Sequence, residues 1–271
     1  MTSIDPTARI DQGAQIGKNV TIGPYCVIGA KVSVGDDCKL LAHVHIAGRT
    51  TIGARTSISA FASLGTPPQS VHYKGEDTGL RIGADCDIRE HVTMNIGTAG
   101  GRGETSVGDK CFFMVGTHIA HDCKIGSNVT FANNATLGGH VEIGDHTFMG
   151  GLCAVHQFVR IGESVIVGGL TGVAFDVIPF AAVVGDRANL VGLNRVGLKR
   201  RGFTPAQMQS VYKAYRAIFF APGKIEERVA VVAEQFAGDE NVMRMVEFIR
   251  SMKTRRLTPP RRAGTRADSD D

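Results

Sequence analysis

The sequence has no tryptophan, and aromatic residues make up only 6% of its 271 positions. A core with so few large rings has to be filled by small and β-branched side chains, and the 34 glycines agree with a thin, repetitive core. No apolar run approaches the roughly 18 to 20 residues that span a bilayer, and the first residues, MTSIDPTARI, lack the pattern of a signal peptide. We therefore expect a cytoplasmic protein without stable membrane insertion.

An excess of one charge is also missing, because the net charge at pH 7 is only +4. The charge is unevenly divided. Residues 190–271 hold 16 Lys and Arg against 9 Asp and Glu, a balance of +7, which leaves residues 1–189 at −3. We expect no nucleic-acid partner, and the C-terminal part is the better candidate for contact with an anionic partner.

Apolar residues recur at every sixth position over most of the chain. The first series runs without a break from Ile16 to Leu64, and two more run from Ile82 to Met94 and from Val107 to Val173. A period of six cannot be the stripe of an α-helix, whose period is 3.6 residues. A fixed short period sustained over this length indicates a solenoid, here short strands stacked as the coils of a parallel β-helix.

A second, smaller inward position precedes each of these apolar residues by two. All six cysteines occupy it: Cys26, Cys38, Cys86, Cys111, Cys123 and Cys153. None belongs to a Cys-x-x-Cys pair, so we interpret them as small buried hydrophobic residues rather than as disulfides, metal ligands or nucleophiles.

Two segments interrupt the hexads. Residues 66–79, TPPQSVHYKGEDTG, place prolines and polar residues where apolar ones are required. Residues 97–105, GTAGGRGET, shift the apolar series by one position. Both are predicted to be external loops, and loops are the parts of a solenoid that carry function.

After Gly185 the hexads give way to helical spacing. Thr204, Pro205 and Gln207 combine an N-cap, a first-turn proline and a capping box, which predicts a helix that ends at Pro222. Two further helices are expected, one from about residue 225 and one from Asp239. The predicted domains are a hexapeptide-repeat domain at 1–189, a helical domain at 190–254 and a disordered tail at 255–271.

Four histidines lie off the apolar series: His118, His121, His140 and His156. If three hexads form one coil of 18 residues, the last three fall near one edge of the prism on successive coils. Two interpretations stay open. Histidines of neighbouring coils can hold zinc, as in the β-helical carbonic anhydrases. Alternatively, a histidine oriented by a carboxylate, such as His121 beside Asp122, can act as a general base.

Four motifs carry a specific resemblance over nearly the whole chain: HIAHDC at 118–123, ANNATLGGHVEIGD at 132–145, GGLCAVHQFVRIG at 150–162 and GLKRRGF at 197–203. They resemble the UDP-N-acetylglucosamine O-acyltransferases that begin lipid A synthesis. The resemblance implies a left-handed parallel β-helix with a small C-terminal helical domain, and a homotrimer with active sites between subunits. It also implies acyl carrier protein as donor, a UDP-sugar as acceptor, and no cofactor or metal.

The resemblance further implies roles for individual residues. His121 matches the general base, Asp122 its orienting partner, and the Gly139 N–H the donor to an oxyanion. Gly169 matches the end of the acyl groove, and Arg200 is one of the residues matched to the phosphates and the carrier arm. The matched substrate-binding positions are Gln69, Lys74, Asn95, His118, His140, His156, Gln157, Gly169, Asn194, Arg200 and Arg201.

Some positions depart from the family pattern. Ser70 and His72 stand where an acidic residue and a lysine are usual, and Arg187 stands where some members have histidine. Asn95 stands where members that use the ordinary sugar typically carry histidine. These differences raise the hypothesis that the acceptor is the 3-amino analogue of the sugar, which would give an amide product.

Other functions compatible with hexads have distinct signatures. An N-acyltransferase acting later in the same pathway would be expected to carry an additional N-terminal uridine-binding domain, whereas these hexads begin by about residue 16. A metal-dependent hydratase would contain stoichiometric zinc. A non-catalytic solenoid would be unaffected by His121→Ala.

Overall fold

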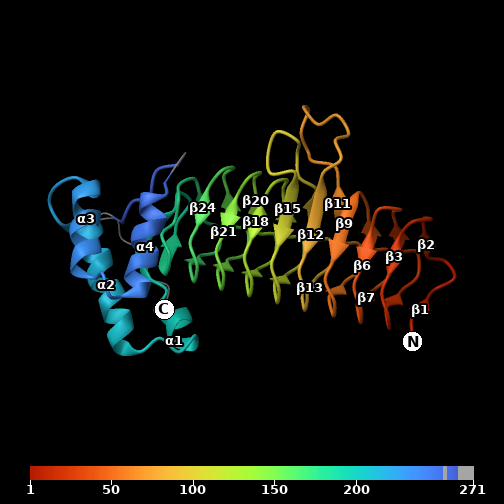
Figure 1. The fold of residues 1–271 in the computed structure, drawn as a ribbon, viewed down its shortest axis with the longest axis horizontal. Coiled ribbons are helices and arrows are strands. Elements are labelled where there is room, and N and C mark those ends of the chain that lie inside the picture. Colours follow the sequence, from red (N-terminus) through yellow and green to blue (C-terminus); the bar gives the residue numbers. More distant parts are fainter. Residues whose placement is uncertain (253–254, 262–271) are drawn as a thin grey trace.

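The computed structural model describes residues 1–252 and 255–261. It is a long prism of stacked coils with the N-terminus at one end and a group of helices at the other (Figure 1). Within the described ranges, none of the helices has the length and apolar content that a bilayer crossing requires.

From β1 to β24, each coil contributes one short strand to each of three sheets, which form the sides of the prism. Sheet 1 contains β1 (Ser3–Ile4), β4 (Thr21–Ile22), β7 (Lys39–Leu40), β10 (Ser57–Ile58), β13 (Asp87–Ile88), β16 (Phe112–Phe113), β19 (Thr130–Phe131), β22 (Phe148–Met149), β25 (Ile166–Val167), β27 (Ala181–Val184) and β28 (Asn189–Leu193). Sheet 2 contains β2 (Arg9–Ile10), β5 (Val27–Ile28), β8 (His45–Ile46), β11 (Ser63–Thr66), β14 (Thr93–Asn95), β17 (His118–Ile119), β20 (Thr136–Leu137), β23 (Ala154–Val155) and β26 (Gly172–Val173). Sheet 3 contains β3 (Gln15–Ile16), β6 (Ser33–Val34), β9 (Arg49–Ile52), β12 (Gly79–Ile82), β15 (Glu104–Val107), β18 (Lys124–Ile125), β21 (Glu142–Ile143) and β24 (Arg160–Ile161).

The register confirms a coil of three hexads. In an uninterrupted coil a residue pairs with the one eighteen positions later, as Thr21 does with Lys39 in parallel strands. Among the strands that the structure describes, β27 and β28 at the end of sheet 1 are the one antiparallel pair. The apolar residues of the hexads from Ile22 onward are buried, and Ile16 in the first coil is partly buried.

All six cysteines are free and buried, as predicted from their position in the hexads. Burial raises the pKa of the Cys123 and Cys153 thiols to about 12, because a thiolate is poorly solvated between the sheets. These side chains therefore serve as core residues in this structure.

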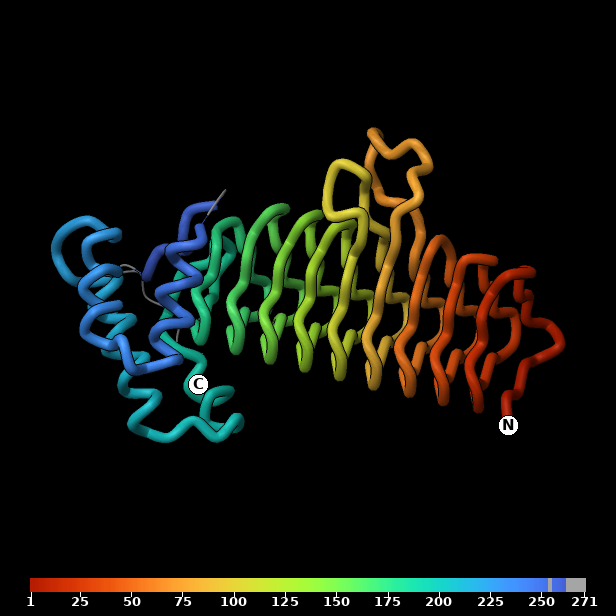
Figure 2. Tube along the Cα trace, viewed as in Figure 1, coloured from red at the N-terminus to blue at the C-terminus, as the bar shows by residue number. Residues whose placement is uncertain are grey.

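Both predicted loops leave the prism at the same corner. We call the edge where the chain passes from sheet 2 to sheet 3 corner 2–3, and name the other two edges corner 1–2 and corner 3–1 in the same way. Residues 67–78 connect β11 to β12, and residues 96–103 connect β14 to β15. Figure 2 shows the two loops side by side on one edge, where they break an otherwise even stack.

Four helices close the C-terminal end: α1 (Arg195–Arg200), α2 (Pro205–Phe220), α3 (Ile225–Gln235) and α4 (Glu240–Arg250). The predicted capping box of α2 is present, with Thr204 and Gln207 bonding each other's backbone. Arg160 joins α4 to sheet 3, because its guanidinium binds the buried Asp176 at 2.8 Å and lies over the Phe248 ring.

The C-terminal boundaries differ from the prediction in three ways. Strand β28 crosses the expected domain boundary at 190, and the short helix α1 was not foreseen. Residues 255–261, expected to be disordered, instead pair with the β-helix through bridges of Leu257 to Asp176 and of Pro260 to Leu190. The rest of the predicted tail, 262–271, lies outside the described residues.

Candidate active site at one corner of the prism

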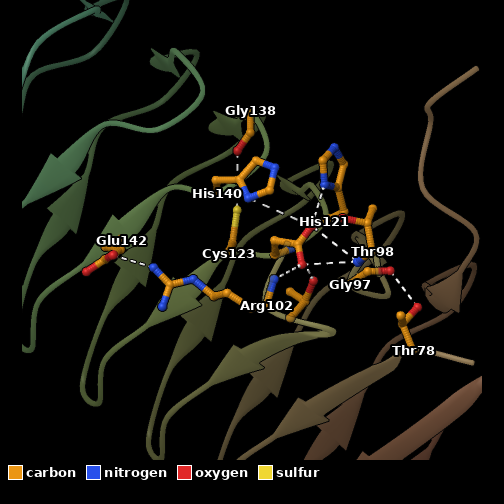
Figure 3. Close-up of polar contacts among 11 residues, drawn as sticks. Thr78, Gly97, Thr98, Arg102, His121, Cys123, Gly138, His140 and Glu142 are labelled. Carbon is orange, nitrogen blue, oxygen red and sulfur yellow. Dashed lines mark hydrogen bonds and ion pairs between the residues drawn. The ribbon is translucent and has the colours of Figure 1, made fainter. Parts of the chain in front are cut away.

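His121 and Asp122 form a hydrogen-bonded pair at corner 2–3, directly after β17. The Nδ1 atom of His121 lies 2.8 Å from Oδ2 of Asp122 (Figure 3). Asp122 has a left-handed φ of 60°, as do the corner residues of other coils, and this turn brings the neighbouring side chains together. Because the carboxylate accepts from Nδ1, a proton lies on that nitrogen, and in the neutral ring Nε2 carries the lone pair.

Asp122 is fully buried, and four donors hold its carboxylate. The Thr98 N–H, the Thr98 hydroxyl at 2.6 Å, the Arg102 N–H at 2.7 Å and His121 all donate to it. Burial acts to raise the pKa of Asp122, but the hydrogen bonds from Thr98, His121 and Arg102 outweigh burial and lower it. The group is therefore a carboxylate at neutral pH.

The loop of residues 96–103 is what surrounds this carboxylate, and it can do so because it is rich in glycine. A Cβ added to Gly101 would lie 2.4 Å from Cγ of Asp122, so only glycine permits this approach. Thr98 and Arg102 were not singled out from the sequence. The only signal was the run of glycines in an insertion.

Gly139 lies one coil above His121, directly against its ring. A Cβ at Gly139 would come within 2.6 Å of Cε1 and 2.7 Å of Nε2 of His121. Within the described part of the chain, the Gly139 amide donates no hydrogen bond. Nε2 of His121 and the unbonded N–H of Gly139 therefore lie next to each other.

His140 and His118 flank the pair. The ring of His140 is edge-on to His121, with centroids 5.0 Å apart, and stacks on Phe158 at 4.3 Å. Its pKa is lowered, mainly by burial. His118 lies on the outer face of sheet 2, where its Nδ1 is 2.8 Å from the Thr93 hydroxyl, and burial lowers its pKa as well.

The remaining predicted residues of corner 2–3 lie on either side of this centre. His156 and Gln157 follow β23 on the C-terminal side and are exposed. Gln69 and Lys74 are exposed in the loop of residues 67–78. Asn95 is buried beneath that loop, where its amide nitrogen donates to Thr66 and Pro67; within the described chain its Oδ1 has no partner.

Four predicted residues are not brought to this corner within one chain. Gly169 is exposed at corner 1–2. Asn194 caps α1 and donates to the Ser164 carbonyl at corner 3–1. Arg201 contacts Ser164 and Glu163 at the same corner, and Arg200 is exposed nearby on α1.

The zinc interpretation was based on histidines of neighbouring coils. Among the described residues, the structure brings His121, Asp122 and His140 together, with one ligand atom of each within 4.8 Å of the others. However, both oxygens of the Asp122 carboxylate already accept hydrogen bonds. One of these bonds joins it directly to His121, which leaves no space for an ion between the two side chains. The arrangement favours acid–base chemistry, in which a carboxylate orients an imidazole.

A stacked-hexapeptide prism with an oriented histidine beside a free amide defines the chain as a hexapeptide-repeat transferase. In agreement, residues 104–139 match a family model described as bacterial transferase hexapeptide. Residues 176–258, which include the helices, match the model for UDP N-acetylglucosamine O-acyltransferase, domain 2.

Relatives and solved structures match the chain over nearly its full length. The acyl-[acyl-carrier-protein]–UDP-N-acetylglucosamine O-acyltransferase of Azorhizobium caulinodans is 55% identical over 96% of this chain and 96% of its own length. That of Rhizobium johnstonii is 44% identical over 96% and 95%. The crystal structure of a UDP-N-acetylglucosamine acyltransferase superposes with a TM-score of 0.93 at 39% identity, covering 96% of this chain and all of the other. The Campylobacter jejuni enzyme gives 0.90 at 38%, with the same coverage. The chain belongs to the UDP-N-acetylglucosamine O-acyltransferase family.

Proposed function

We propose that this chain transfers an (R)-3-hydroxyacyl group from acyl carrier protein to the 3-hydroxyl of UDP-N-acetylglucosamine, the first step of lipid A synthesis. The observation that carries the proposal is the juxtaposition of His121, Asp122 and Gly139 in a chain with full-length relatives of that name. The names of the relatives support the choice of substrates, and the geometry supports the roles proposed for the residues.

In the proposed reaction, Nε2 of His121 takes the proton of the sugar 3-hydroxyl as its oxygen attacks the thioester carbonyl. The carboxylate of Asp122, bonded to Nδ1, stabilises the imidazolium that forms. The Gly139 N–H donates to the tetrahedral oxyanion. When the intermediate collapses, the ester forms, the C–S bond breaks, and the imidazolium proton goes to the leaving sulfur.

A homotrimer would complete the site. Asn194 and Arg201 lie at corner 3–1, away from His121 in the same chain, so they would reach its cleft only from a neighbouring subunit. Corner 1–2 exposes apolar side chains that an interface could cover: Tyr25, Phe61, Leu152 and Leu170. Mixing His121→Ala and Arg201→Ala protomers would test this, because shared sites regain activity in mixed trimers and self-contained sites do not.

The acyl carrier protein is expected to meet the basic C-terminal part. Arg200 is exposed on α1, and residues 190–271 carry a balance of +7. Attraction between an acidic carrier and this surface should weaken as salt is added. A KM for the carrier that does not rise with ionic strength would argue against this docking surface.

A second candidate acceptor is the 3-amino analogue of the sugar, and Asn95 favours it. The buried Oδ1 of Asn95 lacks a hydrogen-bond donor within the described chain. A hydroxyl has one proton, which His121 would remove, whereas an amine has a further N–H that could donate to Asn95. The product would then be an amide instead of an ester.

One assay tests the function and the choice of acceptor. Acyl transfer from 3-hydroxyacyl carrier proteins of several chain lengths is measured with each sugar, using the wild type, His121→Ala and His91→Ala. Transfer that His121→Ala abolishes and His91→Ala retains supports the proposal. Equal or faster turnover of the hydroxyl sugar rules out a preference for the amine, and no transfer to either sugar contradicts the proposed function.

A further inference from the structure

The returning segment of residues 255–261 is fixed to the last coils by backbone hydrogen bonds. The Asp176 N–H donates to the Arg256 carbonyl, the Thr258 N–H donates to the Asp176 carbonyl, and the Leu190 N–H donates to the Pro259 carbonyl, each at 2.8 to 2.9 Å. Thr258 is buried beneath this segment. The segment therefore brings Arg255 to a defined position at corner 2–3.

Arg255 contacts two of the residues predicted to bind substrate. Its Nη2 atom lies 2.6 Å from Nδ1 of His156 and 2.9 Å from the carbonyl oxygen of Gln157. A guanidinium group has only donors and stays charged at all physiological pH values. In this contact Nδ1 of His156 must accept, so the ring is neutral and its proton lies on Nε2.

The same nitrogen of His156 has another partner available. Nδ1 lies 3.2 Å from the Gln157 carbonyl, to which it could donate only if it carried the proton. That arrangement would leave Nε2 without a proton, as an acceptor. Arg255 excludes it, because Nη2 of Arg255 donates to the Nδ1 lone pair of His156, and the same nitrogen also donates to the Gln157 oxygen.

His156 also borders an open cavity of about 520 Å³ on sheet 2, together with Gly172, Phe175 and Arg187. A histidine at the rim of such a cavity presents different chemistry in its two tautomers. With the proton on Nε2 it donates to an acceptor oxygen, such as a phosphate or hydroxyl oxygen, and with the proton on Nδ1 it cannot.

We propose that Arg255 is a positioning residue that holds His156 as an Nε2–H donor to an acceptor oxygen of the nucleotide sugar. The identity of this ligand rests on the proposed function, which assumes that His156 lines the substrate cleft. The choice of tautomer depends only on the Arg255 contact.

The first test is the tautomer itself, read from long-range ¹H–¹⁵N correlation spectra of the full chain with labelled histidine, and His156→Ala assigns the signal. Arg255→Ala should move the proton from Nε2 to Nδ1. Arg255→Lys should keep the wild-type pattern, because an ammonium group also only donates. Arg256→Ala, which removes the neighbouring exposed charge, is the matched control and should change nothing. A wild-type His156 protonated on Nδ1, or one unaffected by Arg255→Ala, overturns the proposal.

The second test is binding of UDP-N-acetylglucosamine by calorimetry, together with steady-state kinetics. Losing one neutral hydrogen bond should weaken binding about 3- to 10-fold in Arg255→Ala, with KM rising and kcat nearly unchanged. Arg255→Lys should recover most of the affinity. Unchanged affinity in Arg255→Ala despite a shifted tautomer would refute the role in binding. Wild type that binds the sugar but transfers no acyl group would contradict the proposed function and leave the Arg255 result standing.

Discussion

Two corners of this prism carry histidines in equivalent positions, yet their surroundings differ completely. At corner 1–2, His43 and His91 alternate with Tyr25 and Phe61 in one column of nearly parallel rings, with centroids 5.0 to 5.2 Å apart. At corner 2–3, the ring of His140 stands edge-on to His121 and stacks on Phe158.

The difference between the two corners does not come from the backbone conformation of these histidines. His43 and His91 have a left-handed φ of 59°, and His140 has one of 62°. What differs is the loop of residues 96–103, which exists only at corner 2–3 and encloses a carboxylate there. Asp122 is fully buried, whereas Tyr25 is 58% exposed. In the coil of the candidate base, Asp122 takes this left-handed position and His121 precedes it. At corner 2–3 the insertion thus buries an anion beside a histidine, whereas at corner 1–2 the left-handed histidines are stacked surface rings.

The largest contrast is expected between His121→Ala and His91→Ala. Removing a general base should lower kcat about 10²- to 10⁴-fold. His91 contacts Phe61 at the other corner, where no buried carboxylate of the described chain lies beside it, so a His91→Ala protein that still forms the proposed trimer should turn over close to wild type. Steady-state acyl transfer measures both, and equal losses in the two variants would show that the corners are not functionally different.

Two glycine-to-alanine substitutions compare the effect of an added methyl group beside His121 with its effect at corner 1–2. Gly139→Ala should displace the His121 imidazole, because the new Cβ would lie 2.6 Å from Cε1. Misplacing a catalytic group by about 1 Å can cost on the order of 10²-fold in rate. Gly151→Ala at corner 1–2 meets only the Asn133 carbonyl at 3.5 Å and the Ala132 Cβ at 4.0 Å, and is the matched control. It should keep the rate with a short-chain donor, and Gly139→Ala with an unchanged rate would contradict contact between Gly139 and the base.

Asp122→Asn tests whether the buried anion also stabilises the fold. The variant should lose about 1–3 kcal/mol of unfolding free energy, because one of the two oxygens that accept from Thr98, Arg102 and His121 becomes an amide nitrogen, which cannot accept. Since the folded pKa of Asp122 is lowered, its contribution is complete above the ordinary carboxyl pKa and declines as the pH falls through the folded value. Denaturation across pH should show a constant difference from wild type at neutral pH that shrinks under acid. A difference independent of pH would contradict this.

The smallest effect is expected from the stacked column. Phe61→Ala breaks two ring contacts, but the side chain is 51% exposed in the single chain, so the loss within one subunit should be at most about 1 kcal/mol. Thermal unfolding with Val71→Ala, an exposed residue of the first loop, as reference measures this. A loss above that of Asp122→Asn would reverse the ranking of the two corners.

The sequence by itself determined the coil. A period of six places Ile22, Ile28 and Val34 on three successive sides of one prism, and the alternation of strand side chains then buries Cys26 and the other cysteines. Local signals also determined the start of α2, because capping involves residues only three positions apart. The positions of both loops followed from the breaks in the same period.

Only the tertiary structure decided which groups meet across coils. Thr98 and Arg102 hold Asp122 from 24 and 20 positions away, and their spacing follows no period because it depends on the path of an insertion. Arg255 reaches His156 from a segment whose polar composition predicted disorder. The amino-acid composition of a segment indicates only how well its residues are solvated on average. Residues 255–261 are ordered by backbone hydrogen bonds to the last coils. The partners in these bonds become available only after those coils have formed.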